Sequence, residues 1–284
     1  MEAPLTRSPT KEEVYGFTFH FRDLKKLSII NGSMDDAIIQ MGLGTYTVFP
    51  VYPGKRVLKL EQHLDSMRYS AKLLGMPFPH TDDGLRAILR RVMDVVPFEH
   101  IRICMLVPCA DPETVLLGIE PYHFPNGSGF RNGVKVGLTR NQRKIPEARD
   151  SRFVILRRKL MKEQADCFEI IIYNSQGDIL EGANSNFFAV IKDQLRTSGK
   201  NVLPGITRNM LLQIKPTYLP VLYEPVHYTD LPYLDEAMIT SSSWGIIPVV
   251  QVNRIRIGDG RPGPITEELQ SMYQTRTEAE LEKI

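Results

Sequence analysis

The alternation of apolar and polar residues predicts two amphipathic helices in the first third of the chain. Apolar side chains recur at three- and four-residue steps over 60–74, and Gly75 and Pro77 end that pattern. Thr81 is followed by two aspartates, which is a helix-capping signal, and a second apolar face begins after it. The residues that this second helix is predicted to bury are Leu85, Ile88, Leu89 and Val92.

Strand-like segments flank these helices. Residues 46–52 are rich in β-branched and aromatic side chains and end at the turn-forming pair Pro53-Gly54. Two further strands are predicted over 101–107 and 114–120. Residues 124–130 hold turn formers too densely for a regular element, so we place the domain boundary there. The predicted organisation is a first domain at 1–124, a joint at 125–132 and a second domain at 133–284.

The second domain mixes both kinds of element. A hairpin is predicted from 169–173 to a strand that begins at Ile179, and 153–164 is predicted to form a helix with a basic outer face. The other predicted elements are strands at 134–138 and 237–240 and helices at 207–214 and 265–273. Helices and strands in both halves favour an α+β protein, with an α+β first domain and a barrel-like second domain.

Composition and charge limit the classes of protein to which the chain can belong. The 284 residues are 42% hydrophobic, which is enough for one large domain or two ordinary ones. A net charge of +2 offers no basic field for nucleic acid, and no apolar run approaches the ~18 residues that would indicate a membrane span. Residues 1–10 lack the apolar segment of a signal peptide and are interpreted as a flexible lead-in, so a cytoplasmic location is expected. The three cysteines, Cys104, Cys109 and Cys167, lack metal-ligand or redox spacing and are interpreted as reduced core thiols, so no metal site is predicted.

Two short segments carry the candidate chemistry. The first, Ile179-Leu-Glu-Gly-Ala-Asn-Ser-Asn-Phe187, places the carboxylate of Glu181 before a glycine, where a ligand can approach the backbone. The second, Leu203-Pro-Gly-Ile-Thr-Arg208, has a tight turn and a helix start whose N–H groups can bind a phosphate, with Thr207 as the predicted cap. Together they indicate a site for a flat, cationic heterocycle that carries a phosphate. Taken alone, the first segment would be interpreted as an exposed glutamate in a turn, and the second as an ordinary capped helix that binds no ligand.

These segments resemble the C-terminal half of the class IV aminotransferases, the pyridoxal-phosphate-dependent family of branched-chain and D-amino-acid aminotransferases and aminodeoxychorismate lyase. Other motifs fall in that family's order and approximate spacing along nearly the whole chain. They are Gly44-Thr-Tyr-Thr47, Leu60-Glu-Gln-His-Leu-Asp65, Ser70-Ala71 and the serine loop before Pro248. The resemblance implies a two-domain, fold type IV architecture, a homodimer and the cofactor pyridoxal 5'-phosphate.

The resemblance also implies roles for individual residues. Glu181 takes the place of the carboxylate that keeps the pyridine nitrogen of the cofactor protonated. The other positions implied to bind the cofactor are Asn186, Ile206, Thr207, Ser242 and Ser243. Ser242 aligns best with a phosphate-binding threonine of the family, although a serine-rich loop is otherwise merely a loop.

Two positions depart from the family pattern. Arg149 occupies the position of the lysine that forms the aldimine, and a guanidinium stays protonated and cannot form an imine. Ser66 occupies the position of the arginine that binds the phosphate, and a hydroxyl supplies no charge. Arg68 lies two residues further along the same helix and is expected to point away. If the register is wrong by several residues, Lys144 is the lysine that reaches the ring.

Three further residues are candidates for a substrate pocket. Tyr46 falls where family members place an aromatic residue beside the substrate, and Trp244 is a candidate wall of the same cavity. Arg102 is a candidate to receive a carboxylate at the domain cleft. The alternatives are that both aromatic residues belong to the core and that Arg102, on an alternating strand, faces solvent. His63 is interpreted as a structural histidine or one that supports another site residue.

Three functions stay open on the sequence. The first is transfer of an amino group between an amino acid and a 2-oxo acid, as the resemblance implies, with Arg149 and Glu181 at the catalytic positions. The second is an enzyme that uses the same cavity without pyridoxal phosphate, and the third is a pseudoenzyme. Because one cation is absent at Ser66 and an inert one stands at Arg149, we expect the pocket to accept an anionic ligand. The expected partners are a small molecule and a second copy of the chain, and neither nucleic acid nor a membrane.

Overall fold

The computed structural model describes residues 13–20, 23–96, 98–122 and 131–284. The chain divides into two compact units. The described part of the first, here the N-terminal unit, is 13–20, 23–96 and 98–122 with 148–158 and 280–284. That of the second, here the C-terminal unit, is 131–147 with 159–279. The predicted domains 1–124 and 133–284 are each continuous, whereas the N-terminal unit includes two later segments because they pair with its strands. Most of the predicted joint 125–132 and all of the lead-in 1–10 lie outside the described residues.

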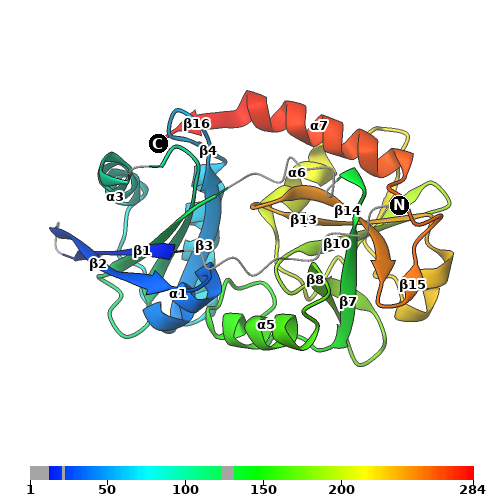
Figure 1. Ribbon diagram of the computed structural model, residues 1–284, viewed down its shortest axis with the longest axis horizontal. Coiled ribbons are helices and arrows are strands. Elements are labelled where there is room, and N and C mark those ends of the chain that lie inside the picture. The colour runs from blue at the N-terminus through cyan, green and yellow to red at the C-terminus, as the bar shows by residue number, and fades with distance from the viewer. Residues whose placement is uncertain (1–12, 21–22, 97, 123–130) are drawn as a thin grey trace. The chain divides into compact units, whose positions relative to one another are not determined.

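A five-stranded antiparallel sheet forms the centre of the N-terminal unit (Figure 1). Its order is β2-β1-β6-β5-β3, and the strands are β1 (Glu13–His20), β2 (Asp23–Asn31), β3 (Gly44–Val51), β5 (Ile101–Pro108) and β6 (Val115–Pro121). The helices of the unit are α1 (Met34–Met41), α2 (Leu60–Leu73), α3 (Asp82–Val95) and the first part of α5 (Arg152–Glu163). A two-stranded sheet pairs β4 (Arg56–Leu58) with β16 (Leu281–Lys283).

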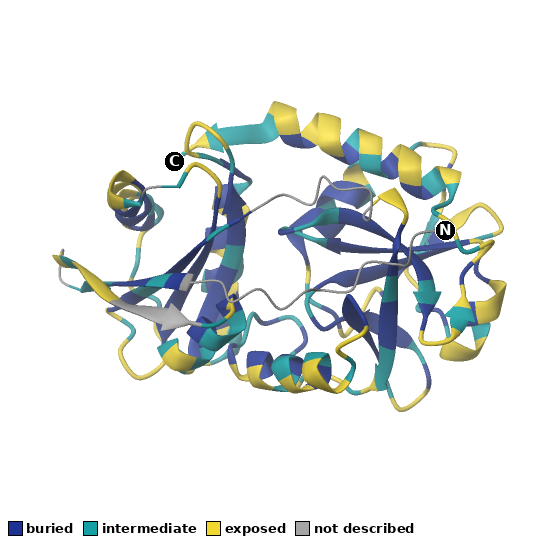
Figure 2. Ribbon diagram, in the orientation of Figure 1, coloured by how far each residue is buried: buried dark blue, intermediate teal, exposed yellow. Residues whose placement is uncertain are grey.

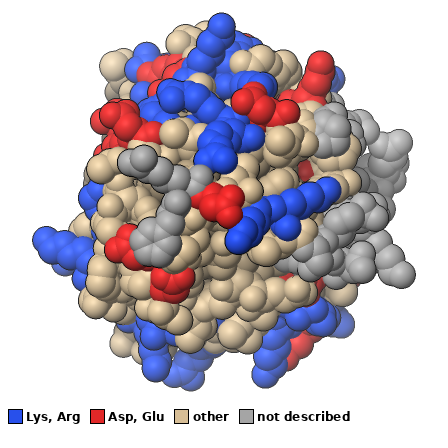
Figure 3. Space-filling model, turned by 90° about the vertical axis from the view of Figure 1, so that its left-hand side faces the viewer, with Lys and Arg blue, Asp and Glu red and all other residues tan. Residues whose placement is uncertain are grey.

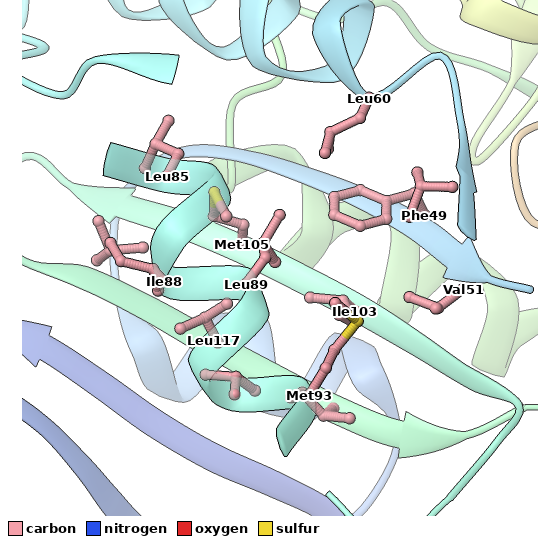
Figure 4. Close-up of a cluster of buried hydrophobic side chains, with 14 of the residues drawn as sticks. Phe49, Val51, Leu60, Leu85, Ile88, Leu89, Met93, Ile103, Met105 and Leu117 are labelled. Carbon is pink, nitrogen blue, oxygen red and sulfur yellow. The ribbon is translucent and has the colours of Figure 1, made fainter. Parts of the chain in front are cut away.

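Strand β5 is buried on both faces of the sheet, because its alternate residues enter different cores. Ile103 and Met105 pack with residues of α2 and α3, whereas Cys104 and Leu106 pack with residues of α1. Figure 4 shows α3 lying over the sheet, with Leu89 close to Met105 and Ile103. The apolar face predicted for this helix is confirmed, since Leu85, Ile88, Leu89 and Val92 are all buried.

Most elements predicted for this half of the chain are confirmed. The strands at 46–52, 101–107 and 114–120 and both helices are present. Thr81 caps α3, because its Oγ1 accepts a hydrogen bond from the Gly84 N–H (3.2 Å). The sequence prediction missed β1, β2 and α1. For α1 a signal was available, since Ser33 and Asp36 form a capping box at its start.

The sheet of the C-terminal unit closes on itself. Its strands follow the order β10-β13-β14-β7-β8-β9, and a further pairing between Glu181 of β9 and Asn186 of β10 completes a ring. The strands of the ring are β7 (Val134–Arg140), β8 (Glu169–Tyr173), β9 (Ile179–Gly182), β10 (Asn186–Ile191), β13 (Glu236–Ser241) and β14 (Gly245–Val252). Three short strands extend it: β11 (Gln194–Arg196), β12 (Val221–Leu222) and β15 (Ile255–Arg256). The ring brings the two ends of the Glu181-to-Asn186 motif side by side.

The remaining helices of this unit are the end of α5, α6 (Ile206–Ile214), the 3-10 helix η1 (Tyr228–Tyr233) and α7 (Pro264–Glu280). Figure 2 shows the exposed residues of α7 along one side and its buried residues along the other. The predicted hairpin, the strands at 134–138 and 237–240 and the three predicted helices are confirmed. The last helix, predicted at 265–273, continues to Glu280.

The surface carries charges of both signs. Figure 3 shows lysine and arginine side chains next to aspartate and glutamate side chains on the displayed face. One such pair in the N-terminal unit is Lys55 and Asp94, whose Nζ and Oδ1 atoms lie 2.7 Å apart. Among the residues described, no helix has the length and apolar character needed to cross a membrane, and no group of three or more His, Cys, Asp or Glu side chains could hold a metal ion. The expectation that all three cysteines lie in the core is wrong for Cys109, which is exposed just after β5; Cys104 and Cys167 are buried.

Candidate ligand site

The main chain at Arg149 is fixed to the central sheet of the N-terminal unit. The carbonyl of Arg149 accepts a hydrogen bond from the N–H of Tyr46 (3.3 Å), and the N–H of Ser151 donates to the carbonyl of Gly44 (3.0 Å). Thr45 and Asp150 form a β-bridge between the same two segments. Residues 149–151 therefore lie as a short added edge along the start of β3.

Two serines of α2 bind Arg149. Ser66 and Ser70 are one helical turn apart and so project from the same side of the helix. The Nε–H of Arg149 donates to Ser66 Oγ (2.9 Å), and its backbone N–H donates to Ser70 Oγ (2.9 Å). The Ser70 hydroxyl in turn donates to the carbonyl of Ser66 (2.6 Å). The two positions that are predicted to depart from the family pattern are thus in direct contact.

His63 is buried on the same helix. Its Nδ1 lies 2.7 Å from Thr47 Oγ1, and its ring centroid lies 5.0 Å from that of Phe49. Burial lowers the pKa of His63 well below its usual value, and the positive charge of Arg149 lowers that pKa further. The surroundings therefore stabilise a neutral imidazole, which agrees with a supporting role for His63.

The lysines nearest to Arg149 in the sequence lie at the surface, and Arg68 is paired with aspartates. Lys144, the alternative lysine, is exposed, and so are Lys159 and Lys162. No lysine in the described part of the chain is buried. Arg68 donates to Asp65 (2.6 Å) and also pairs with Asp82, as expected for a side chain that points away from Ser66.

In the C-terminal unit, both carboxylate oxygens of Glu181 have protein partners. Oε1 lies 2.9 Å from Nε of Arg143, and Oε2 accepts a hydrogen bond from the N–H of Leu203 (3.0 Å). The Glu181 and Arg143 side chains are only 3% and 8% exposed. Burial raises the pKa of Glu181, while Arg143 and the Leu203 N–H oppose that rise. Glu181 is therefore a buried, engaged carboxylate, and the alternative of an exposed turn residue is wrong.

Asn186 holds the same loop as Glu181. Its Nδ2 donates to the carbonyl of Leu203 (2.8 Å), so the two side chains bind both polar groups of the Leu203 main chain. A Cβ added at Gly205 would lie 2.1 Å from Asn186 Oδ1. A glycine is therefore needed at 205 for the loop to approach Asn186 this closely. The strand closure of the ring thereby positions the turn that leads into α6.

The start of α6 leaves backbone donors without side-chain caps. Gly205 is the N-cap, and among the described residues no side chain caps the helix. The first N–H groups of a helix have no acceptor within it, and the helix dipole favours an anion there. The expectation that Thr207 caps the helix is wrong, because Thr207 lies inside α6, where its hydroxyl is 3.4 Å from the hydroxyl of Tyr273. Ile206 and Thr207 are both buried.

The serine loop and the aromatic residue after it lie in the C-terminal unit. Ser242 and Ser243 form part of the turn after β13, where Ser243 is buried and its N–H donates to Ser241 Oγ (3.3 Å). Trp244 follows them and packs edge-on against Phe168, with ring centroids 4.8 Å apart.

Tyr46 and Arg102 are buried in the N-terminal unit. The Tyr46 hydroxyl accepts a hydrogen bond from Nη1 of Arg157 (3.2 Å). Arg102 donates to Glu120 Oε1 through Nε (2.6 Å) and lies over the Tyr122 ring. Both side chains are engaged by other protein groups, so a substrate role for either one stays a prediction.

Sequence reasoning missed Arg143 and Glu169. Arg143 carries no local signal, because its pairing with Glu181 depends on how the ring of strands closes. Glu169 is fully buried at the start of β8, and its Oε2 accepts hydrogen bonds from Asn184 N–H (3.0 Å) and the Ser185 hydroxyl (3.3 Å). A glutamate at the start of an apolar strand is rarely buried unless it has hydrogen-bond partners. The position of Glu169 beside the apolar run 170–172 was therefore the signal that the sequence offered.

The chain belongs to the amino-transferase class IV family, whose model matches residues 44–252. It is 27% identical over 260 residues to a Thermotoga maritima protein named "Probable branched-chain-amino-acid aminotransferase", covering 87% of this chain and 88% of that one. It is 25% identical over 263 residues to the D-alanine aminotransferase of Listeria innocua, covering 84% of this chain and 89% of the relative.

Solved structures share the fold. The branched-chain aminotransferase of Thermoproteus uzoniensis with norvaline matches with a TM-score of 0.74 and 19% identity, over 95% of this chain and 99% of that one. The branched-chain amino acid aminotransferase of Escherichia coli matches with a TM-score of 0.70 and 20% identity, over 96% of this chain and 99% of that one. The predicted class IV family and its α+β, fold type IV architecture are confirmed.

Pyridoxal 5'-phosphate, the cofactor that the family implies, does not fit the residues at positions 149 and 66. Position 149 offers no primary amine, and position 66 offers no charge.

Proposed function

We propose that this member of the class IV aminotransferase family binds a small anionic ligand and forms no aldimine at position 149. The observation that carries the proposal is the hydrogen bond from Arg149 Nε to Ser66 Oγ, which ties together the two positions where the family would place a lysine and an arginine. A guanidinium cannot attack an aldehyde, but it binds carboxylates and phosphates well. The site has therefore kept an affinity for anions without the imine chemistry.

The ligand that we propose is an amino acid or a 2-oxo acid, or a phosphate compound of similar size. Relatives named as branched-chain-amino-acid and D-alanine aminotransferases support the first class. The uncapped start of α6 supports an anion in the C-terminal unit, with Ile206 and Thr207 donating through the main chain. We assign supporting contacts to Ser242 and Ser243. A homodimer and a cytoplasmic location stay predictions.

The absence of an aldimine can be tested by adding pyridoxal phosphate to the purified protein. A bound aldimine absorbs above about 400 nm and is fixed to its lysine by borohydride. We expect no such band and no fixed adduct for the natural chain. Arg149→Lys is expected to gain the band, and Arg152→Lys, which places a lysine at an exposed neighbouring position, is the control that should stay colourless.

Two results would contradict this function. One is a borohydride-fixed adduct on any lysine of the natural chain, found by peptide mass spectrometry, together with transfer of an amino group to a 2-oxo acid. The other is a melting temperature that inorganic phosphate and small 2-oxo acids leave unchanged, since a ligand that binds the folded state raises it.

A further inference from the structure

We propose that Ser66 is the positioning residue of Arg149, and that the two side chains form one unit that binds a carboxylate or a phosphate group. This inference rests on the proposed function. It starts from geometry: the Nε–H of Arg149 donates to Ser66 Oγ at 2.9 Å. A guanidinium is planar, so fixing the direction of Nε–H fixes the plane of the whole group.

The bond to Ser66 also selects how an anion can bind. A guanidinium has five N–H donors and receives an oxyanion either along the Nε edge or at the end that carries the two Nη atoms. Because Ser66 accepts the Nε–H of Arg149, the Nε edge cannot receive an oxyanion while this hydrogen bond is kept.

The unit is rigid because each of its parts is held separately. Ser66 lies on α2, and the hydroxyl of Ser70 joins the Ser66 carbonyl to the backbone N–H of Arg149. The carbonyl of Arg149 is bound by Tyr46 in β3. A group ordered before its ligand arrives loses less conformational entropy on binding. Ser66 thus contributes to affinity through Arg149 without touching the ligand.

The contact also explains why the two departures from the family occur together. An arginine at 66 would bring a second guanidinium to the point where Arg149 Nε now finds a hydroxyl, and like charges in contact repel. A serine at 66 removes this repulsion and supplies an acceptor. The substitutions at 66 and 149 are therefore one coupled change, and Ser66→Arg is expected to lose anion binding unless Arg149→Lys accompanies it.

The test is a binding cycle by calorimetry, with inorganic phosphate in one arm and 2-oxobutyrate in the other, so that the two sources of oxyanion are distinguished. Ser66→Ala is expected to weaken binding about tenfold, as for loss of one oriented hydrogen bond. Ser66→Thr keeps the hydroxyl and should stay within about twofold of the natural chain. Arg149→Gln should weaken binding by more than Ser66→Ala does, and Ser66→Ala should then have no further effect in the Arg149→Gln background. Arg152→Gln, which removes an exposed neighbouring charge, is the control.

A second readout needs no ligand. The Nε–Hε signal of Arg149 in a ¹⁵N NMR spectrum should exchange slowly with water in the natural chain and in Ser66→Thr, and rapidly in Ser66→Ala. If Ser66→Ala binds both anions as the natural chain does, or leaves this signal unchanged, the positioning role is overturned while the proposed function stands. If the natural chain binds neither anion, the proposed function is overturned as well. Ser66→Ala could also lower the affinity for the anion as much in the Arg149→Gln background as in the natural chain. Ser66 would then act independently of Arg149, which also contradicts the inference.

Discussion

At the scale of single residues, His63 combines burial, a hydrogen bond and a nearby charge. The ring is enclosed by the core of the N-terminal unit, and Thr47 Oγ1 lies 2.7 Å from Nδ1. Protonating this ring would place a second positive charge near Arg149 in a buried site. The neutral ring therefore supports a site in which the guanidinium supplies the positive charge.

The lowered pKa of His63 predicts a pH dependence of folding stability. The unfolded chain binds a proton at this histidine near pH 6.5, whereas the folded protein resists protonation to a much lower pH. The unfolded state then holds more protons below about pH 6.5, so stability is complete above that pH and decreases as the pH falls. Urea unfolding between pH 8 and pH 5 should show this decrease, and His63→Gln should make it smaller.

The matched control for this measurement is His100→Gln at an exposed position. That variant should keep the pH dependence of the natural chain. A His63→Gln protein whose stability falls as steeply with acid as the natural chain would show that other groups cause the loss.

At the scale of elements, β16 caps the N-terminus of α2, the helix whose serines bind Arg149. Lys59, the N-cap of α2, has a left-handed backbone (φ 53°) and no side-chain cap. Glu282 of β16 supplies the missing acceptor, because its Oε1 receives the N–H of Leu60 (2.9 Å). The same carboxylate pairs with Arg86 of α3 (3.1 Å). A carboxylate at a helix N-terminus is favourable, so β16 stabilises α2 as well as pairing with β4.

Glu282→Ala is therefore expected to lower the free energy of unfolding by about 1 kcal/mol, the usual cost of a lost helix cap. Glu282→Gln keeps an acceptor oxygen and should lose less. Glu278→Ala, at an exposed position of α7, is the control and should change stability little. Urea unfolding of the three variants checks this, and an equal effect at 278 and 282 would contradict the capping role.

At the scale of the whole molecule, the accessibility of the three thiols measures how well the cores of the two units are closed to solvent. Cys104 and Cys167 are buried, and burial raises the pKa of Cys167 to about 11 and raises the pKa of Cys104 as well. Because the thiolate is the reactive form, both should react slowly with a disulfide reagent. Cys109 is exposed.

One thiol per chain is therefore expected to react rapidly in the native protein, and all three after unfolding in urea. A thiol assay with 5,5'-dithiobis(2-nitrobenzoate) measures the count. Cys109→Ser should remove the rapid phase. A second rapid thiol in the native protein would mean that one of the cores opens readily.

The sequence alone determined the local elements and the family. The periodicity of 60–74 and 81–92 was sufficient for α2 and α3, because a helix is specified by neighbours three and four residues apart. The motifs around Glu181 and Gly205 identified the family, and the same resemblance predicts that Arg149 and Ser66 depart from its pattern.

Only the tertiary structure decided what those departures do together. Ser66 and Arg149 are 83 residues apart in the chain, and their hydrogen bond exists because residues 149–151 lie along β3 beside α2. The pairing of Glu181 with Arg143 and the capping of α2 by Glu282 likewise depend on strands that meet only after folding. Such contacts leave no periodic pattern in the sequence, since they are fixed by the packing of distant segments and by the burial of charges that need partners.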